Sequence, residues 1–286
     1  MKSQDPNKEH LQSIISLYTQ GLLQQALSES NQMLKRFPNS VILYNIAGAS
    51  NAALMQFDAA IESYKQALRI KPDYADAYYN MGVALNDKGN PEAAIECYKQ
   101  ALRINPDYFK AYNNMGVALN YKSDPEAAIE SYKQALRINP DYADAYNNMG
   151  VALNDNGDPE AAIESYKQAL RINPDYADAY NNMGSALKDK GDLEEAIDNY
   201  KQALRIKPDY AEGYSNLGAA QLLLNHTEQA IASYEKAISL KKDLNTAISG
   251  LGMVLLKKGE HSEGLDKLRH GDGSILFNIK SGISIK

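Results

Sequence analysis

The chain has 286 residues, of which 30 are Lys or Arg and 36 are Asp or Glu, so its net charge is −6. This balance argues against nucleic acid as a partner, because neutralising phosphates requires clustered Lys and Arg. The single cysteine, Cys97, excludes an internal disulfide framework and is typical of a reducing compartment. The first residues lack an apolar secretory segment, and no apolar run approaches the roughly 20 residues that span a bilayer. We therefore expect a soluble, cytoplasmic protein that does not bind membranes.

Prolines mark an internal repeat. They recur every 34 residues, at Pro38, Pro72, Pro106, Pro140, Pro174 and Pro208. With this proline at the thirty-second position, the expected repeats are 7–40, 41–74, 75–108, 109–142, 143–176, 177–210, 211–244 and 245–278. The first and last are degenerate, as terminal repeats that face water tend to be. A repeat array over 1–278 thus replaces the two domains that the length alone suggests.

Each repeat predicts two helices, which we derive for repeat 143–176. We expect the first helix to begin after Asp141, as its N-cap, and to end before Gly157. The second begins after Asp158, which precedes a proline and a glutamate that suit a first helical turn. It ends before Pro174, because the residue before a proline avoids the helical conformation.

Apolar residues form one stripe on each helix at helical spacing. Those of the first are Tyr146, Met149, Gly150 and Leu153. Those of the second are Ala162, Ile163, Tyr166, Ala169 and Leu170. A glycine inside a helix costs about 1 kcal/mol relative to alanine. The recurrence of Gly150 in five repeats therefore predicts a close approach, which we place beside Ala162 where the two helices cross.

This pattern resembles the tetratricopeptide repeat (TPR). The residues that carry the resemblance are Tyr146, Met149, Gly150, Ala162, Tyr166, Ala169 and Pro174. The strings NNMG and KQALRINPDYADAY are similar to the repeat region of O-linked N-acetylglucosamine transferases. The resemblance implies an all-α fold, a right-handed superhelical solenoid of antiparallel helix pairs. It implies a binding module without that enzyme's catalytic domain.

The surface left over on each first helix consists of repeat positions 2, 5, 6, 9, 12 and 13, which we call the inner face. In TPR arrays this face lines the concave side of the superhelix. Its sixth position reads Asn80, Asn114, Asn148, Asn182 and Asn216. Its fifth position includes Tyr79, Asn113, Asn147 and Asn181, and its second position Asp76, Lys110, Asp144 and Asp178. We predict that these residues bind peptide.

The recurring asparagines support two interpretations. A side-chain amide offers a donor and an acceptor, so a ladder of amides can bind the backbone of an extended peptide. The resemblance implies this use, because sixth-position asparagines hold polypeptide in the transferases. Alternatively, the asparagine is structural and bonds to the neighbouring repeat. A ladder of ten neutral hydrogen bonds yields roughly 5–15 kcal/mol against an association cost of about 4–15 kcal/mol, which predicts weak binding.

Charges on the inner face are mostly negative, which favours a neutral to basic peptide. The alternative is a solvated acidic surface. Lys or Arg never occupies the fifth position, so we do not expect the carboxylate clamp of chaperone-binding TPR proteins. We expect the binding specificity to come from residues that differ between otherwise similar inner repeats and from the tail that follows the repeats. The residues that differ are Tyr79, Lys110, Tyr121 and Lys188.

No pattern predicts a catalytic residue, a metal site or a cofactor. The four histidines lack metal-ligand spacing, and no phosphate-binding glycine loop is present. Cys97 takes the place of a small polar residue in other repeats, which favours a filler over a reactive thiol. The tail 279–286 alternates isoleucines with polar residues and predicts a strand. Its alternatives are an edge for self-association, a cover for the last helix, the start of a further domain, and a frayed end.

The function that we expect is a non-catalytic scaffold for protein–protein interaction. Two alternatives remain. One is the substrate-recruiting arm of a larger enzyme, such as a glycosyltransferase. The other is a structural homo-oligomer that associates through its divergent ends.

Overall fold

The structure is a computed structural model that describes residues 5–272, 275–278 and 282–285. These residues form sixteen α-helices and two short β-strands. The chain divides into two compact units, Met1–Asp141 and Tyr142–Lys286, and each has its own buried clusters. No helix within the described ranges is long and apolar enough to cross a bilayer.

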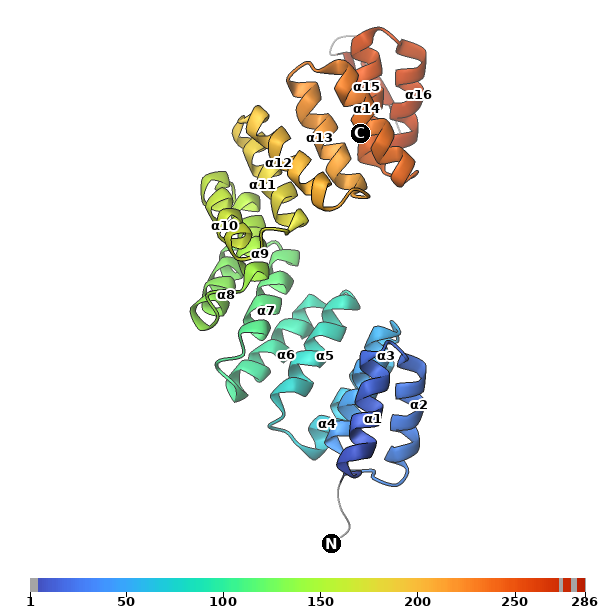
Figure 1. The fold of residues 1–286 in the computed structure, drawn as a ribbon, viewed down its shortest axis with the longest axis vertical. Coiled ribbons are helices and arrows are strands. Elements are labelled where there is room, and N and C mark those ends of the chain that lie inside the picture. The colour runs from blue at the N-terminus through green and yellow to red at the C-terminus, as the bar shows by residue number, and fades with distance from the viewer. Residues whose placement is uncertain (1–4, 273–274, 279–281, 286) are drawn as a thin grey trace. The chain divides into compact units, whose positions relative to one another are not determined.

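The first unit consists of four helix pairs, drawn in blue to green in Figure 1. Its helices are α1 (Lys8–Thr19), α2 (Leu23–Leu34), α3 (Val41–Ala53), α4 (Phe57–Ile70), α5 (Ala75–Asp87), α6 (Pro91–Ile104), α7 (Phe109–Tyr121) and α8 (Pro125–Ile138). Each odd-numbered helix packs against the even-numbered helix that follows it. That second helix then packs against the first helix of the next pair, so the pairs stack in sequence order.

The second unit repeats this arrangement. Its helices are α9 (Ala143–Asp155), α10 (Pro159–Ile172), α11 (Ala177–Lys190), α12 (Leu193–Ile206), α13 (Ala211–Leu223), α14 (Thr227–Leu240), α15 (Asn245–Lys258) and α16 (His261–Asp272). The fold is therefore all-α in class, built of stacked antiparallel pairs, as the sequence predicts.

Capping follows the prediction at one helix of the pair and departs from it at the other. The Oδ1 atom of Asp158 accepts a hydrogen bond from the backbone N–H of Ala161 at 3.0 Å, and Pro159 fills the first turn of α10. Asp141 is not an N-cap, and that prediction is wrong. Tyr142 occupies the cap of α9 without a side-chain bond. The backbone N–H of Asp141 instead donates to Oδ1 of Asn139 at 3.3 Å, so it belongs to the preceding turn.

The first helix of each pair ends at a residue in the left-handed conformation. Gly157 has φ of +83°, which confirms it as the stop after α9. Met55 lies at the same repeat position after α3, with φ of +60°. A methionine side chain disfavours this conformation, because its Cβ crowds the following carbonyl oxygen.

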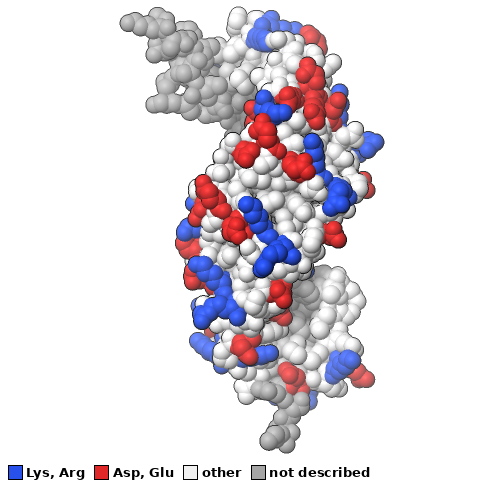
Figure 2. Space-filling model, turned by 90° about the vertical axis from the view of Figure 1, so that its left-hand side faces the viewer, with Lys and Arg blue, Asp and Glu red and all other residues white. Residues whose placement is uncertain are grey.

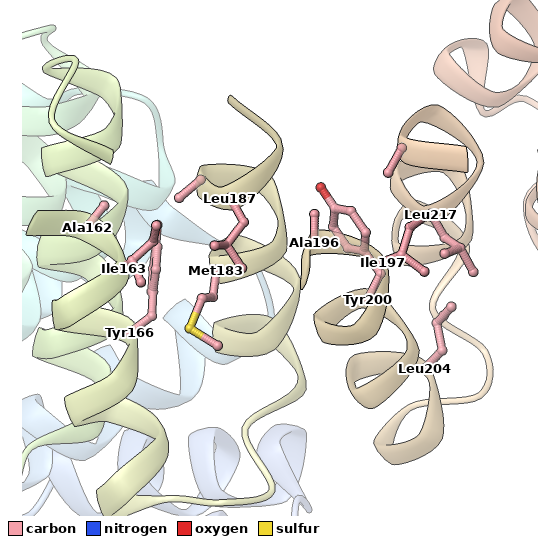
Figure 3. Packing of buried hydrophobic residues seen from close by; sticks show 12 residues of the cluster. Ala162, Ile163, Tyr166, Met183, Leu187, Ala196, Ile197, Tyr200, Leu204 and Leu217 are labelled. Carbon is pink, nitrogen blue, oxygen red and sulfur yellow. The ribbon is translucent and has the colours of Figure 1, made fainter. Parts of the chain in front are cut away.

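In the six inner helix pairs, from α3–α4 to α13–α14, the core is built on a buried tyrosine and a glycine. Tyr166 is 2% exposed and lies in a cluster that connects α10 to α13, which Figure 3 shows from close by. A Cβ on Gly150 would lie 2.5 Å from Cε1 of the Tyr166 ring, so only glycine fits there. The close approach predicted for Gly150 is therefore confirmed, and its neighbour is the tyrosine ring.

Two strands follow the last helix. The strand β1 (Ile275–Asn278) pairs antiparallel with β2 (Gly282–Ile285), with Ile275 opposite Ile285. The first strand thus precedes the tail 279–286 in which the sequence predicts one, and it occupies the end of the last expected repeat. Ile279 and Ser281 of that prediction lie outside the described residues.

Candidate peptide-binding surface

The sixth-position asparagines join neighbouring repeats. Nδ2 of Asn80 donates to Oδ1 of Asn45 at 3.1 Å in the first unit. In the second unit, Nδ2 of Asn182 donates to Oδ1 of Asn147 at 3.1 Å, and Nδ2 of Asn216 to Oδ1 of Asn181 at 3.0 Å. Each donor is partly exposed. These amides therefore bond to a neighbouring repeat, as the structural interpretation of the recurring asparagines expects.

The fifth-position asparagines do not lie on the surface. Asn113, Asn147 and Asn181 are 4%, 6% and 6% exposed, so the prediction that they face a ligand is wrong. The helical wheel of one repeat places this position opposite the core, but the next repeat covers it. Tyr79, at the same position, is partly exposed; its hydroxyl accepts from Nδ2 of Asn114 at 3.1 Å.

The second-position carboxylates are exposed and also bridge repeats. Oδ1 of Asp76 accepts from the Tyr108 hydroxyl at 3.0 Å, and Oδ1 of Asp144 accepts from Tyr176 at 3.0 Å. Burial, followed by the charge of the neighbouring carboxylate, raises the pKa of both tyrosines. The remaining second-position residues in the predicted site are Lys110, which is exposed, and Asp178, which accepts from a tyrosine in the same way.

Three hollows lie along the inner face of the first unit. The first, of about 360 Å³, is lined by inner-face residues of α1, α3 and α5: Ile15, Tyr18, Ile42, Asn45, Ile46, Ala49 and Asn80. The second, of about 240 Å³, shares Tyr18, Ala49 and Asn80 with it and adds Ala52, Ala53, Tyr64, Val83 and Asp87. The third, of about 730 Å³, shares Ala52 and Asp87 with the second. The shared residues connect the hollows along one path.

The residues that distinguish this path are absent from the predicted site. The predicted site lies in the near-identical repeats from 75 onward, whereas Ile15 and Ile42 belong to the two repeats before them. Met55 was also missed, although it stands where most repeats carry Gly, Ser or Asn. That substitution of an apolar residue for a turn residue is the pattern that could have revealed the site.

Charge on the path is concentrated at Asp87, which lines two of the hollows. Burial raises the pKa of its carboxyl group. Elsewhere the charges are mixed; Figure 2 shows basic and acidic side chains interspersed over one face. The neighbouring Lys88 forms an ion pair with Asp58.

The described residues hold no group of three or more His, Cys, Asp or Glu side chains arranged to bind a metal ion. Cys97 is buried, and burial raises the pKa of its thiol to about 11. A thiol of this pKa is almost fully protonated at neutral pH and is therefore a poor nucleophile.

Comparisons with known proteins agree with this architecture. The TPR repeat model matches residues 53–89, 118–157, 152–191 and 184–225, which together cover half of the chain. Tetratricopeptide repeat models also match 75–108, 97–130 and 211–244. The chain is 36% identical over 76 residues to a probable UDP-N-acetylglucosamine–peptide N-acetylglucosaminyltransferase, SEC, of Arabidopsis thaliana. That match covers 27% of this chain and only 8% of the transferase.

Two solved structures are similar in fold. A crystal structure of the APC/C hetero-tetramer Cut9–Hcn1 matches with a TM-score of 0.72 and 18% identity, over 87% of this chain and 49% of that chain. A crystal structure of MamA matches with a TM-score of 0.53 and 31% identity, over 58% of this chain and 96% of that one. With the repeat models that cover half of its length, the chain belongs to the tetratricopeptide repeat family.

Proposed function

We propose that this protein is a non-catalytic scaffold that binds extended polypeptide along the inner face of its first helices. One observation carries the proposal. The hollow of about 360 Å³ is lined entirely by residues at the second, fifth, sixth, ninth and twelfth repeat positions. Clefts of about 300–1,000 Å³ are typical of ligand sites. The positions that the repeat pattern assigns to a ligand therefore form a recess of suitable size in the first unit.

The asparagines have a second role in this proposal. A side-chain amide has two N–H groups, and the bond to the previous repeat uses one of them. That bond also fixes the amide's orientation, so the second N–H of Asn182 is held in place for a peptide carbonyl at little entropic cost. Each such bond contributes about 0.5–1.5 kcal/mol. Five such bonds sum to roughly 2.5–7.5 kcal/mol, which only meets the association cost of about 4–15 kcal/mol. We therefore expect weak binding by the amides alone, with side chains bound in the hollows supplying most of the affinity.

The ligand that we propose is neutral to basic. Second-position carboxylates such as Asp76 and Asp144 keep one oxygen that their tyrosine does not use. Asp87 adds an acidic group on the path of the hollows. A surface of one sign raises the local concentration of ligands of the other.

The test uses a peptide selected from a random display library against the whole chain. Ala49 lines two of the hollows, so Ala49→Arg places a long side chain on the path. We expect this variant to weaken the fluorescence-anisotropy affinity at least about tenfold. The matched control is Ala232→Arg, at an exposed alanine of α14. We expect this control to leave the affinity for the peptide unchanged. Equal affinity of wild type and Ala49→Arg contradicts the proposal.

The match to the transferase favours a second candidate, a substrate-recruiting arm of a larger enzyme. The two differ in the size of the native protein. A mass in its own cells near 31.6 kDa supports the scaffold. A larger chain with a glycosyltransferase domain supports the arm.

A further inference from the structure

The largest hollow on the path lies where α3, α5 and α7 end. Its walls are Ala52, Met55 and Phe57 on one side and Asn86, Asp87 and Tyr121 on the other, with Gly89 and Pro91 between α5 and α6. The three helices are neighbours in the first unit (Figure 1). At about 730 Å³ the hollow has the volume of a ligand site, and most of its walls are apolar or aromatic.

Two large side chains at this hollow are mostly exposed to solvent. Met55 is 77% exposed, and Tyr121 is 75% exposed. Met55 also keeps a left-handed backbone, with φ of +60°, which a glycine adopts without strain. A strained residue that gains almost no burial does not stabilise the fold. Strain of this kind accumulates at functional sites, so it points to a use for the methionine.

The charged side chain that lines this hollow is Asp87. In the part of the chain that the structure describes, no Lys, Arg or His lines the hollow. The two nearest lysines in sequence to Asp87 and Tyr121 have other partners: Lys88 pairs with Asp58, and Nζ of Lys122 lies 3.3 Å from Oε1 of Glu92. The charge of Asp87 also raises the pKa of buried Tyr98, after the larger effect of burial. The local field of the hollow is therefore negative.

We propose that this hollow binds an arginine side chain of the extended polypeptide, with the guanidinium on Asp87 and its flat face on Tyr121. The inference rests on the proposed function and names the residue that the site selects. Arginine fits better than lysine for two reasons. Its planar guanidinium stacks on an aromatic ring, and its fork of N–H groups matches a carboxylate. Its methylene stem packs against Met55 and Phe57, as long cationic side chains do on apolar surface.

The hollow is continuous with the rest of the peptide path. Asp87 and Ala52 line both this hollow and the next one, which extends to Tyr18 and Asn80. A polypeptide lying on the sixth-position asparagines can thus place one side chain at Asp87 without leaving the inner face. Adjacent helices lie about 8–10 Å apart, and an extended chain rises about 3.3 Å per residue. The hollow also lies further along the helices, because Met55 follows Ile42 by 13 residues, a rise of about 20 Å. The arginine is therefore expected about six residues from the side chain bound at Ile42.

The experiment compares four peptides of one display-selected sequence that differ only at the residue facing the hollow: Arg, Lys, citrulline or Glu. Citrulline keeps the shape of arginine without its charge. We expect the whole chain to bind the Arg peptide at least about tenfold more tightly than the citrulline peptide. Lysine is expected to fall between them, and glutamate to bind most weakly. Fluorescence anisotropy measures all four.

Variants of the chain assign the preference to the hollow. Asp87→Asn is expected to abolish the preference for Arg over citrulline. Asp155→Asn, at the same repeat position of a nearly identical repeat, is the matched control and keeps the preference. Tyr121→Ala is expected to reduce the preference for Arg over citrulline. Because the Tyr121 side chain is exposed, this variant is expected to keep the melting temperature of the wild type.

Two outcomes overturn the inference in different ways. If a selected peptide binds but Arg and citrulline bind equally tightly, or if Asp155→Asn removes the preference as Asp87→Asn does, the arginine site is wrong and the scaffold stands. If no peptide binds the chain at all, the proposed function fails and the arginine site fails with it.

Discussion

Asn182 donates from Nδ2 to Oδ1 of Asn147 across 3.1 Å, and this bond joins two successive repeats. Asn147 is 6% exposed, so its carbonyl oxygen depends on that donor. The pair shows how an amide on the inner face can hold two repeats together and still present a second N–H to a ligand.

Loss of that donor is expected to destabilise the second unit. Asn182→Ala leaves the buried Asn147 amide without its partner, which costs about 1–3 kcal/mol. The double variant with Asn147→Ala is expected to be no less stable than Asn182→Ala alone, because it removes the unpaired acceptor as well. Urea denaturation measures both, with exposed Asn156→Ala as the control. Strictly additive losses from the two single changes contradict the pairing.

Gly150→Ala tests the packing of glycine against tyrosine. In an open helix this change stabilises by about 1 kcal/mol. Here the new Cβ would lie 2.5 Å from the Tyr166 ring, so we expect a net loss of about 1–3 kcal/mol. Adding Tyr166→Leu makes room for the methyl group and is expected to make Gly150→Ala harmless or favourable in that background. A stabilised single variant contradicts this account of the core.

Stability is expected to fall at high pH because of the buried tyrosines. Burial raises the pKa of Tyr234 from 10.0 to about 12. Above pH 10 the unfolded chain therefore releases a proton that the folded chain retains. The stabilisation, complete below pH 10, is lost as pH rises towards 12. In urea titrations from pH 8 to 12, Tyr234→Phe should show a shallower decline than wild type. Parallel declines contradict the assignment.

Met55→Gly is expected to separate stability from binding. It removes the strain of a left-handed methionine and loses little burial, so we expect the free energy of unfolding to rise by about 1 kcal/mol. The same change removes one wall of the largest hollow and should weaken the Arg peptide severalfold. Met253→Ala, at an exposed methionine in helix α15, is the control for the general effect of losing a methionine side chain, because alanine does not disfavour the helix. A variant that gains stability and keeps full affinity contradicts a role for Met55.

Features set within one repeat could be predicted from the sequence. The Asp158 cap and the Gly157 stop depend on residues a few positions apart, so local chemistry determines them. Gly150 recurs against its helical cost, which revealed the close approach without naming Tyr166 as the cause. The family resemblance supplied the pairing of helices.

Features that need two or three repeats at once could not be predicted. The fifth position of an isolated helix points away from the core, yet the following repeat buries Asn147. The large hollow combines Met55, Asp87 and Tyr121 from three successive repeats. Met55 and Tyr121 are single departures in their own repeats, whereas Asp87 stands where Asp155 and Asp189 also carry a carboxylate. Only the stacking of the helices brings the three residues together.

The most direct test of the central claim is to find which face of the first unit touches a bound peptide. Benzoylphenylalanine at Val83 on α5, which lines the peptide path, is expected to crosslink a display-selected peptide. The same probe at exposed Lys99 on α6 is expected to crosslink none. Capture from position 99 in place of position 83 would contradict binding on the inner face.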